Sequence, residues 1–297
     1  MSPKNQAARD FLTTRRAKIT PRMAGLPDYG TTTRRVPGLR REEVALLAGV
    51  SADYYTRMEK GNLAGVSEEV LDAVARALQL DEDERRYLLD LARAARRPTR
   101  APGRTRRARG VSHRVQLLID SMGATPVIAH DGCLDILGAN PLGRALFSAA
   151  YDSPTRRSST AHPNLAAFVF LDPAAQDFYA DIDEAAAVCV HMLRAHAGAA
   201  PYDKHLTGLI GELSTRSPEF RTRWAAHDVS THRAGAKALH HHDVGELILG
   251  FEQLTIASTP TITLSTYIAE PNSPTAERLQ LLASWARTTT AANTPQP

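Results

Sequence analysis

The 297-residue sequence lacks most features of membrane, secreted and metal-binding proteins. No apolar run approaches the ~18 residues that a transmembrane helix needs, so we expect no membrane insertion. The first residues, MSPKNQAARDFL, contain no apolar core of signal-peptide length. The two cysteines, Cys133 and Cys189, form no CxxC pair, which excludes a zinc finger and a disulfide scaffold. These absences favour the reducing cytoplasm.

Common enzyme signatures are also missing. The sequence contains no GxSxG, P-loop, GxGxxG or HExxH motif, which mark hydrolases, nucleotide-binding proteins and zinc proteases. The run His240, His241 and His242 is the feature that most resembles a metal site. On a strand, His240 and His242 point to one face and His241 to the other, so the run alone does not make a site. We therefore expect no catalytic residue, no metal and no cofactor; an enzyme using this segment is the alternative.

Charge is unevenly distributed along the chain. Residues 1–110 contain 23 Lys and Arg against 14 Asp and Glu, whereas residues 111–297 contain 13 against 18. A basic first part beside an acidic second part indicates a polyanionic partner for the first part only. Arginine outnumbers lysine 31 to 5, a bias that favours a bacterial source with GC-rich DNA.

Composition also divides the chain into domains. The pattern of residues 1–97 predicts short helices at 6–18, 40–48 and 51–60, a helix capped by Ser67 and another that begins at Asp81. An arginine-rich stretch broken by proline and glycine follows. We predict an all-α domain at 1–97, a linker at 98–110, a second domain at 111–287 and a flexible tail at 288–297.

The most informative stretch is residues 40–61, RREEVALLAGVSADYYTRMEKG. It predicts two short helices that meet at Gly49, a residue that allows positive φ in a turn. Ala45, four residues earlier, is small enough for the helices to cross closely. Tyr55 and Met58 fall on one face of the second helix, from which they can pack on the first. This pattern is typical of a helix-turn-helix, although many helical hairpins share it.

A helix-turn-helix places its second helix in the major groove of DNA, with its N-terminal residues toward base edges. The positions that we predict to face DNA are Ser51, Ala52, Asp53, Tyr54 and Arg57. Arg57 can donate two hydrogen bonds to guanine, and Ala52 can contact a thymine methyl group. The preceding helix crosses the DNA backbone, so we expect Arg40 and Arg41 to contact phosphates.

Three of these positions also have a structural interpretation. Asp53 either accepts a hydrogen bond from cytosine or stabilises the dipole at the start of its helix. Tyr54 either reaches a phosphate or covers a neighbouring side chain. The alternative for Arg57 is a solvated arginine with no partner on DNA.

The second part of the chain has a mixed pattern. Strand-like runs at 125–130 and 134–139 flank Asp131-Gly132, a strong hairpin signal. Helical stretches follow at 141–149, 173–197, 202–213 and 218–227. Strand-like runs at 229–241, 246–256 and 261–269 precede a final helix at 274–286. This order predicts an α+β domain with about five antiparallel strands and helices over one face.

Several segments resemble one known family. The stretch RVPGLRREEVALLAGVS from Arg35, followed by DYYTR and EKG, is similar to the Xre-type helix-turn-helix of MmyB-like transcription regulators. The segments NPLGRALF, FLDP, LIGELS, EFR, WAAHDV and AEP resemble the ligand-binding domain of that family. The resemblance covers nearly the whole chain except the linker, residues 151–160 and the tail. Ile182 stands where relatives usually have tryptophan, and His242-Asp243 replaces a proline-containing turn.

The resemblance implies a sequence-specific regulator that binds double-stranded DNA and has a PAS-like C-terminal domain for a small apolar, fatty-acid-like ligand. The candidate pocket residues lie in the matching segments or beside them: Phe168, Phe170, Leu206, Ile210 and Trp224. Each of them is alternatively a plain core residue. A domain that only dimerises or binds a protein partner is the alternative to a ligand sensor. We also expect a homodimer, located in the cytoplasm on the nucleoid.

Overall fold

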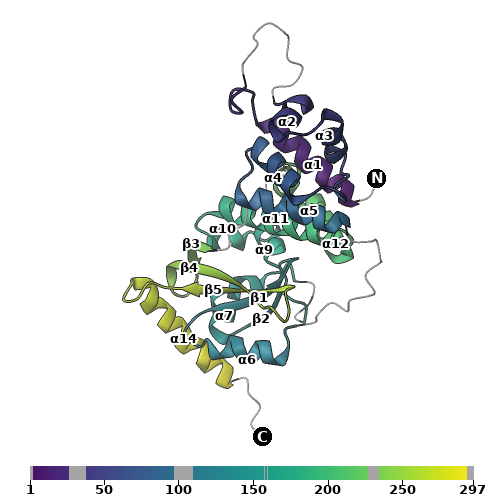
Figure 1. Cartoon of the computed structure of the whole chain (residues 1–297). Coiled ribbons are helices and arrows are strands. Elements are labelled where there is room, and N and C mark those ends of the chain that lie inside the picture. The colour runs from purple at the N-terminus through teal and green to yellow at the C-terminus, as the bar shows by residue number, and fades with distance from the viewer. Residues whose placement is uncertain are drawn as a thin grey trace. The chain divides into compact units, whose positions relative to one another are not determined.

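The computed structural model describes residues 3–26, 38–96, 110–156, 158, 160–226 and 234–292 (Figure 1). The chain forms two compact units. The first contains residues 1–104, 194–207 and 222–230, and the second contains residues 105–193, 208–221 and 231–297. Most of the predicted linker, the start of the family-like stretch at Arg35 and the end of the predicted tail lie outside the described residues.

Five short helices form the N-terminal part of the first unit: α1 Pro3–Lys18, α2 Arg41–Ala48, α3 Ala52–Glu59, α4 Glu68–Ala77 and α5 Glu82–Arg96. Local capping explains where two of them start. The Ser67 hydroxyl accepts a hydrogen bond from the Val70 N–H at 3.4 Å, and the Asp81 carboxylate accepts one from the Glu84 N–H at 2.8 Å. The predicted helices are therefore confirmed, with α1 beginning earlier than expected.

One apolar core holds these helices together. Phe11 of α1, Tyr55 of α3, Leu71 of α4 and Leu88 of α5 are almost completely buried and belong to the same cluster. Each such side chain contributes roughly 1.5–3 kcal/mol on burial, so the shared core dominates the stability of helices too short to persist alone.

The second unit is built on a five-stranded antiparallel sheet, as predicted. Its strands are β1 Val127–Asp131, β2 Ile136–Ala139, β3 Ala234–His241, β4 Gly245–Thr255 and β5 Ile262–Ile268, in the spatial order β2-β1-β5-β4-β3. The first two strands form the hairpin expected at Asp131-Gly132. The left-handed residue of this turn is Leu134, with φ of 66°, and not Gly132. The Asp131 carboxylate stabilises the turn by accepting hydrogen bonds from the Cys133 and Asp135 N–H groups.

The remaining helices are α6 His113–Ser121, α7 Pro141–Leu146, α8 Ser148–Asp152, α9 Leu165–Leu171, α10 Ala174–Phe178, α11 Ile182–Ala199, α12 Lys204–Arg216, α13 Pro218–Ala225 and α14 Pro274–Ala292. By the division above, α11, α12 and α13 each contribute residues to both units. The helix α9 was not predicted. The helix α14 continues past the expected end at 286, because no proline or glycine interrupts the sequence before Pro295.

The prediction of a single helix at 173–197 is wrong. The segment is divided into α10 and α11 because Tyr179 pairs with Leu239 of β3 and the Ala180 N–H donates to the Ala238 carbonyl at 3.2 Å. Asp181 then starts α11 by accepting a hydrogen bond from the Glu184 N–H at 2.8 Å.

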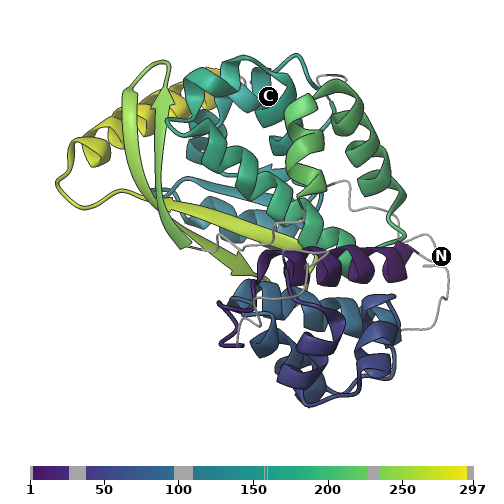
Figure 2. The same ribbon diagram turned by 90° about the horizontal axis from the view of Figure 1, so that it is seen from above.

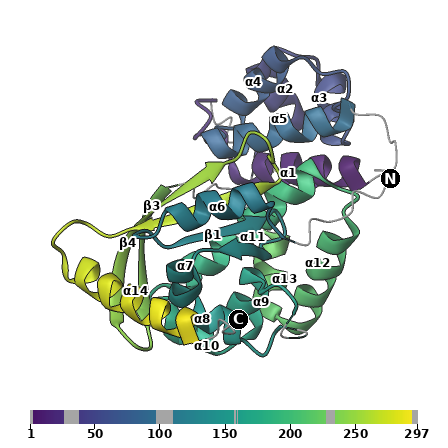
Figure 3. The ribbon, with the colours of Figure 1, turned by 90° about the horizontal axis from the view of Figure 1, so that it is seen from below.

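Helices cover both faces of the sheet, which corrects the prediction of one covered face. Val127 and Ala129 of β1 pack with Leu264 of β5 against Val115 and Ile119 of α6. Alternate residues of the same strands point the other way, toward α11. At the far edge, α14 runs beside the β3–β4 hairpin (Figure 2) and packs on α7 (Figure 3).

Candidate DNA interface and ligand cavity

The turn between α2 and α3 has the geometry of a helix-turn-helix. Gly49 adopts φ of 67°, and its N–H donates to the Leu46 carbonyl at 3.2 Å. The Val50 N–H donates to the Ala45 carbonyl at 2.9 Å, which completes a Schellman motif. Ala45 is buried where the two helices meet, as its small size predicts. The turn therefore fixes the angle at which α3 leaves α2.

Ser51 starts α3 and marks the end that would approach base edges. Its hydroxyl accepts a hydrogen bond from the Tyr54 N–H at 3.1 Å. Tyr55 and Met58 are buried in the core, as the sequence predicts. Ser51, Asp53 and Arg57 are exposed, and Ala52 and Tyr54 are partly buried. Of the predicted DNA-facing residues of α3, Ser51, Asp53 and Arg57 thus lie on the side away from the core, whereas Ala52 and Tyr54 pack partly against it.

Arg57 and Tyr54 are neighbours on this surface. The guanidinium carbon of Arg57 lies 5.4 Å from the centroid of the Tyr54 ring. This distance allows a cation–π interaction, worth about 0.5–1 kcal/mol at an exposed site. Covering of a neighbour, one of the two interpretations of Tyr54, is therefore present in the free protein. An interaction this weak leaves Arg57 able to turn toward a DNA base.

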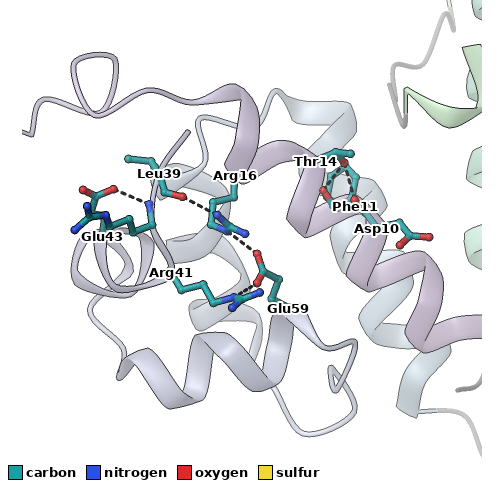
Figure 4. Close-up of polar contacts among 9 residues, drawn as sticks. Asp10, Phe11, Thr14, Arg16, Leu39, Arg41, Glu43 and Glu59 are labelled. Carbon is teal, nitrogen blue, oxygen red and sulfur yellow. Dashed lines mark hydrogen bonds and ion pairs between the residues drawn. The ribbon is translucent and has the colours of Figure 1, made fainter. Parts of the chain in front are cut away.

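A buried carboxylate anchors the other end of α3. Glu59 is 2% exposed, and its Oε1 accepts a hydrogen bond from Arg16 Nε of α1 at 2.5 Å (Figure 4). Its Oε2 is contacted by Arg41 of α2. Arg16 also donates to the Leu39 carbonyl at 2.7 Å, which ties the segment before α2 into the same network. No spacing in the sequence indicates this role of Glu59, because Arg16 lies 43 positions away.

The two arginines expected to contact phosphates have different surroundings. Arg40 is exposed, and its backbone N–H donates to the Glu43 carboxylate at 2.6 Å at the start of α2. Arg41 has a side chain that is 53% exposed, but its Nε is paired with Glu59. Arg41 therefore has a structural partner in the free protein, and its other N–H groups are the ones available to a phosphate.

The second unit contains a cavity of about 40 Å³ between the sheet and α11. Its sheet side is formed by His130, Lys237, Phe251, Gln253, Ser265 and Tyr267. Its helix side is formed by Ala185, Val188, Cys189 and Met192 of α11. Phe251 pairs with Tyr267, and Gln253 pairs with Ser265, in the register of β4 and β5, so these side chains share one face.

Hydrogen bonds fix the state of His130 at this cavity. Its Nδ1 lies 3.1 Å from the Asp131 carbonyl oxygen, which can only accept, so Nδ1 carries the proton. Its Nε2 lies 3.1 Å from the Ser265 hydroxyl and accepts from it. Burial lowers the pKa of His130, so the neutral ring is favoured.

The five pocket residues predicted from the sequence lie elsewhere. Phe168 is fully buried against Phe178 and Tyr179, and Phe170 packs on Phe220. Leu206 is buried, Ile210 is partly buried, and the Trp224 ring lies 4.3 Å from the Arg194 guanidinium carbon. None of the five is on the lining of the cavity beside α11. A role for them in ligand binding stays a prediction.

The histidine run follows the predicted strand alternation. His241 is buried, whereas His240 and His242 are exposed. His241 Nε2 lies 3.0 Å from the Ala145 carbonyl, and its Nδ1 accepts from the Asp243 N–H at 3.2 Å. Both ring nitrogens therefore have partners, and a metal ion would have to displace one of them.

The first unit thus contains a helix-turn-helix whose second helix has an exposed outer side, and the second is an α+β domain with an internal cavity; together these define a DNA-binding regulator. Residues 12–88 match the model of a helix-turn-helix domain. Residues 111–282 match the model of the MmyB-like transcription regulator ligand binding domain. Because this match covers more than half of the sequence, the chain belongs to the MmyB-like transcription regulators. No match was found among curated proteins.

None of the helices in the described part of the chain combines the length and the apolar character needed to cross a membrane.

Proposed function

We propose that this regulator binds specific DNA sequences through α3 and is controlled by a small, fatty-acid-like ligand in its second unit. The observation that carries the first part is the surface of α3. Ser51, Asp53 and Arg57 are exposed, while Tyr55, Met58 and Glu59 hold the opposite side in the core. A short helix held this firmly can enter the major groove without rearranging.

Ligand control is supported by the cavity and by the family to which the second unit belongs. The cavity opens between α11 and the sheet, so an occupant touches two layers of the fold at once. An occupant that binds one arrangement of these layers better than another shifts the population between them. We propose that this shift decides whether two copies of α3 match the spacing of DNA half-sites.

A homodimer is the state that such spacing requires. Ile248 and Leu254 of β4 and Ile268 of β5 are exposed large apolar residues on one face of the sheet. Exposed apolar side chains on a sheet face are a place where a protein partner can bind. This observation also supports the alternative, in which the second unit only dimerises or binds another protein. As a DNA-binding regulator, the protein would act on the nucleoid in the cytoplasm.

A DNA titration tests the first part of the proposal. A duplex recovered from a random pool and its scrambled version are titrated with full-length protein between 50 and 200 mM salt. We expect preference for the recovered duplex and an affinity that falls steeply with salt, because phosphate contacts release counterions. Equal affinity for both duplexes would contradict specific recognition.

Native mass spectrometry of gently purified protein tests the second part. A bound mass of a fatty-acid-like molecule, whose addition changes the affinity for the recovered duplex, supports ligand control. A dimer that carries no small molecule, and whose DNA affinity no added ligand changes, favours the alternative.

A further inference from the structure

Lys237 is the one charged residue among the described residues that line the cavity beside α11. It lies on β3, and its Nζ is 5.0 Å from the centroid of the Phe251 ring. No carboxylate within the described part of the chain forms an ion pair with this ammonium group. Cys189 and Glu184 of α11 influence it only electrostatically. Lys237 is half-buried, and a partly desolvated cation is costly unless an anion joins it.

Three of the surrounding polar groups are protonated hydrogen-bond donors rather than negative charges. Burial raises the pKa of Cys189 to about 12 and raises the pKa values of Tyr179 and Tyr267 well above their ordinary value. All three groups therefore keep their protons at neutral pH. No Asp or Glu belongs to the lining. A ligand that accepts hydrogen bonds and carries negative charge complements this set of groups.

The rest of the wall is apolar and restricts size. Leu134, Phe147, Leu165, Ala185, Val188 and Met192 supply it. The cavity of about 40 Å³ has room for roughly three water molecules. This volume suits an acid with a short hydrocarbon body, whereas a long acyl chain would require the walls to separate.

We infer that the cavity binds a compact organic carboxylate, with its acid group paired to the Lys237 ammonium and its short apolar body against α11. This inference rests on the proposed ligand control and narrows the ligand class. It also explains why a lysine stands at this position, because a methionine would fill the same space without a partly buried charge.

Isothermal titration of the full-length protein with sodium propionate, and with propionamide as its neutral analogue, tests the inference. We expect propionate to bind and propionamide to bind at least tenfold more weakly. Lys237→Met should weaken propionate binding by tenfold or more and leave propionamide unchanged. Lys237→Arg keeps the charge and should retain propionate binding. That result would show that the site tolerates replacement of the lysine. Lys204→Met, at an exposed lysine, is the control for net charge.

Three outcomes would overturn the inference: equal binding of acid and amide, unchanged propionate binding in Lys237→Met, or tighter binding of tetradecanoate than of propionate. These results leave the regulator function itself intact if the protein still prefers its recovered duplex. Conversely, Lys237-dependent propionate binding in a protein without DNA preference would contradict the proposed function and support the cavity assignment.

Discussion

Arg16 Nε donates to Glu59 Oε1 across 2.5 Å and so ties α1 to the last residue of α3, the second helix of the helix-turn-helix. Arg41 contacts the second oxygen of the same carboxylate, which adds α2 to the network. Glu59 is almost fully buried, so its charge depends on these two guanidinium groups. The position of α3 is therefore set from both ends, by the turn at Gly49 and by this carboxylate.

Replacing Glu59 should destabilise the first unit strongly. Glu59→Gln leaves Arg16, whose side chain is 12% exposed, without its anionic partner. We expect the free energy of unfolding to fall by about 3–5 kcal/mol, the usual effect of removing one partner of a buried pair. Urea unfolding of the full-length protein measures it. Glu69→Gln, at an exposed position of α4, is the control; an equal, small effect in both variants would show that the network does not hold α3.

Two glycines of the helix-turn-helix should respond differently to alanine. Gly49 has φ of 67° with open space around it, so Gly49→Ala adds only backbone strain, about 1–2 kcal/mol. Gly61 has φ of 93°, and an added Cβ would lie 2.2 Å from the Asn5 carbonyl oxygen of α1. Gly61→Ala should therefore lower the free energy of unfolding clearly more than Gly49→Ala does. Thermal unfolding of both variants ranks them, and a larger loss for Gly49→Ala would contradict this order.

Local features of the fold could be predicted from the sequence, because they depend on neighbouring residues. Ser51, Ser67 and Gly49 cap or end helices through bonds within a few positions. The break at Tyr179 could not be predicted, since it depends on pairing with Leu239 of a distant strand.

The same limit applies to the site. Arg57 was predicted because its spacing within α3 determines its exposure. The pairing of Glu59 with Arg16 joins residues 43 positions apart, and sequence spacing does not encode such a contact. Lys237 was missed for a similar reason, since only the register of β3 beside β4 and the packing of α11 place it at the cavity.

Acid should destabilise the second unit through His130. Burial lowers its pKa from the ordinary 6.5, with Lys237 adding to the shift and Asp131 opposing it. Below pH 6.5 the unfolded chain therefore binds more protons, and the free energy of unfolding falls as pH falls. Burial lowers the pKa of His241 as well, so His241 adds to the decrease in the free energy of unfolding at low pH. His130→Gln should reduce the loss of stability between pH 7 and pH 5 in urea unfolding, while a replacement at exposed His113 should not.

Lys237→Met should raise stability when no ligand is bound. Burial lowers the pKa of Lys237 below the ordinary 10.5, so the charged form is disfavoured in the fold. Stability of the unchanged protein should rise with pH from that lowered pKa up to 10.5, because the unfolded chain holds more protons there. At pH 7 we expect a gain on the order of 1 kcal/mol in the variant. A clearly lower Tm for Lys237→Met than for the unchanged protein, with no such decrease for Lys204→Met, would indicate a structural role instead.

Whether α3 reads DNA is tested by selecting binding sites from a random duplex pool, with the unchanged protein and with Arg57→Ala in parallel. We expect a defined motif for the unchanged protein. For the variant we expect loss of preference at one base position and about 1–3 kcal/mol weaker binding to that motif. Recovery of no motif, or of the same motif with the same strength by both proteins, would contradict reading of DNA by α3.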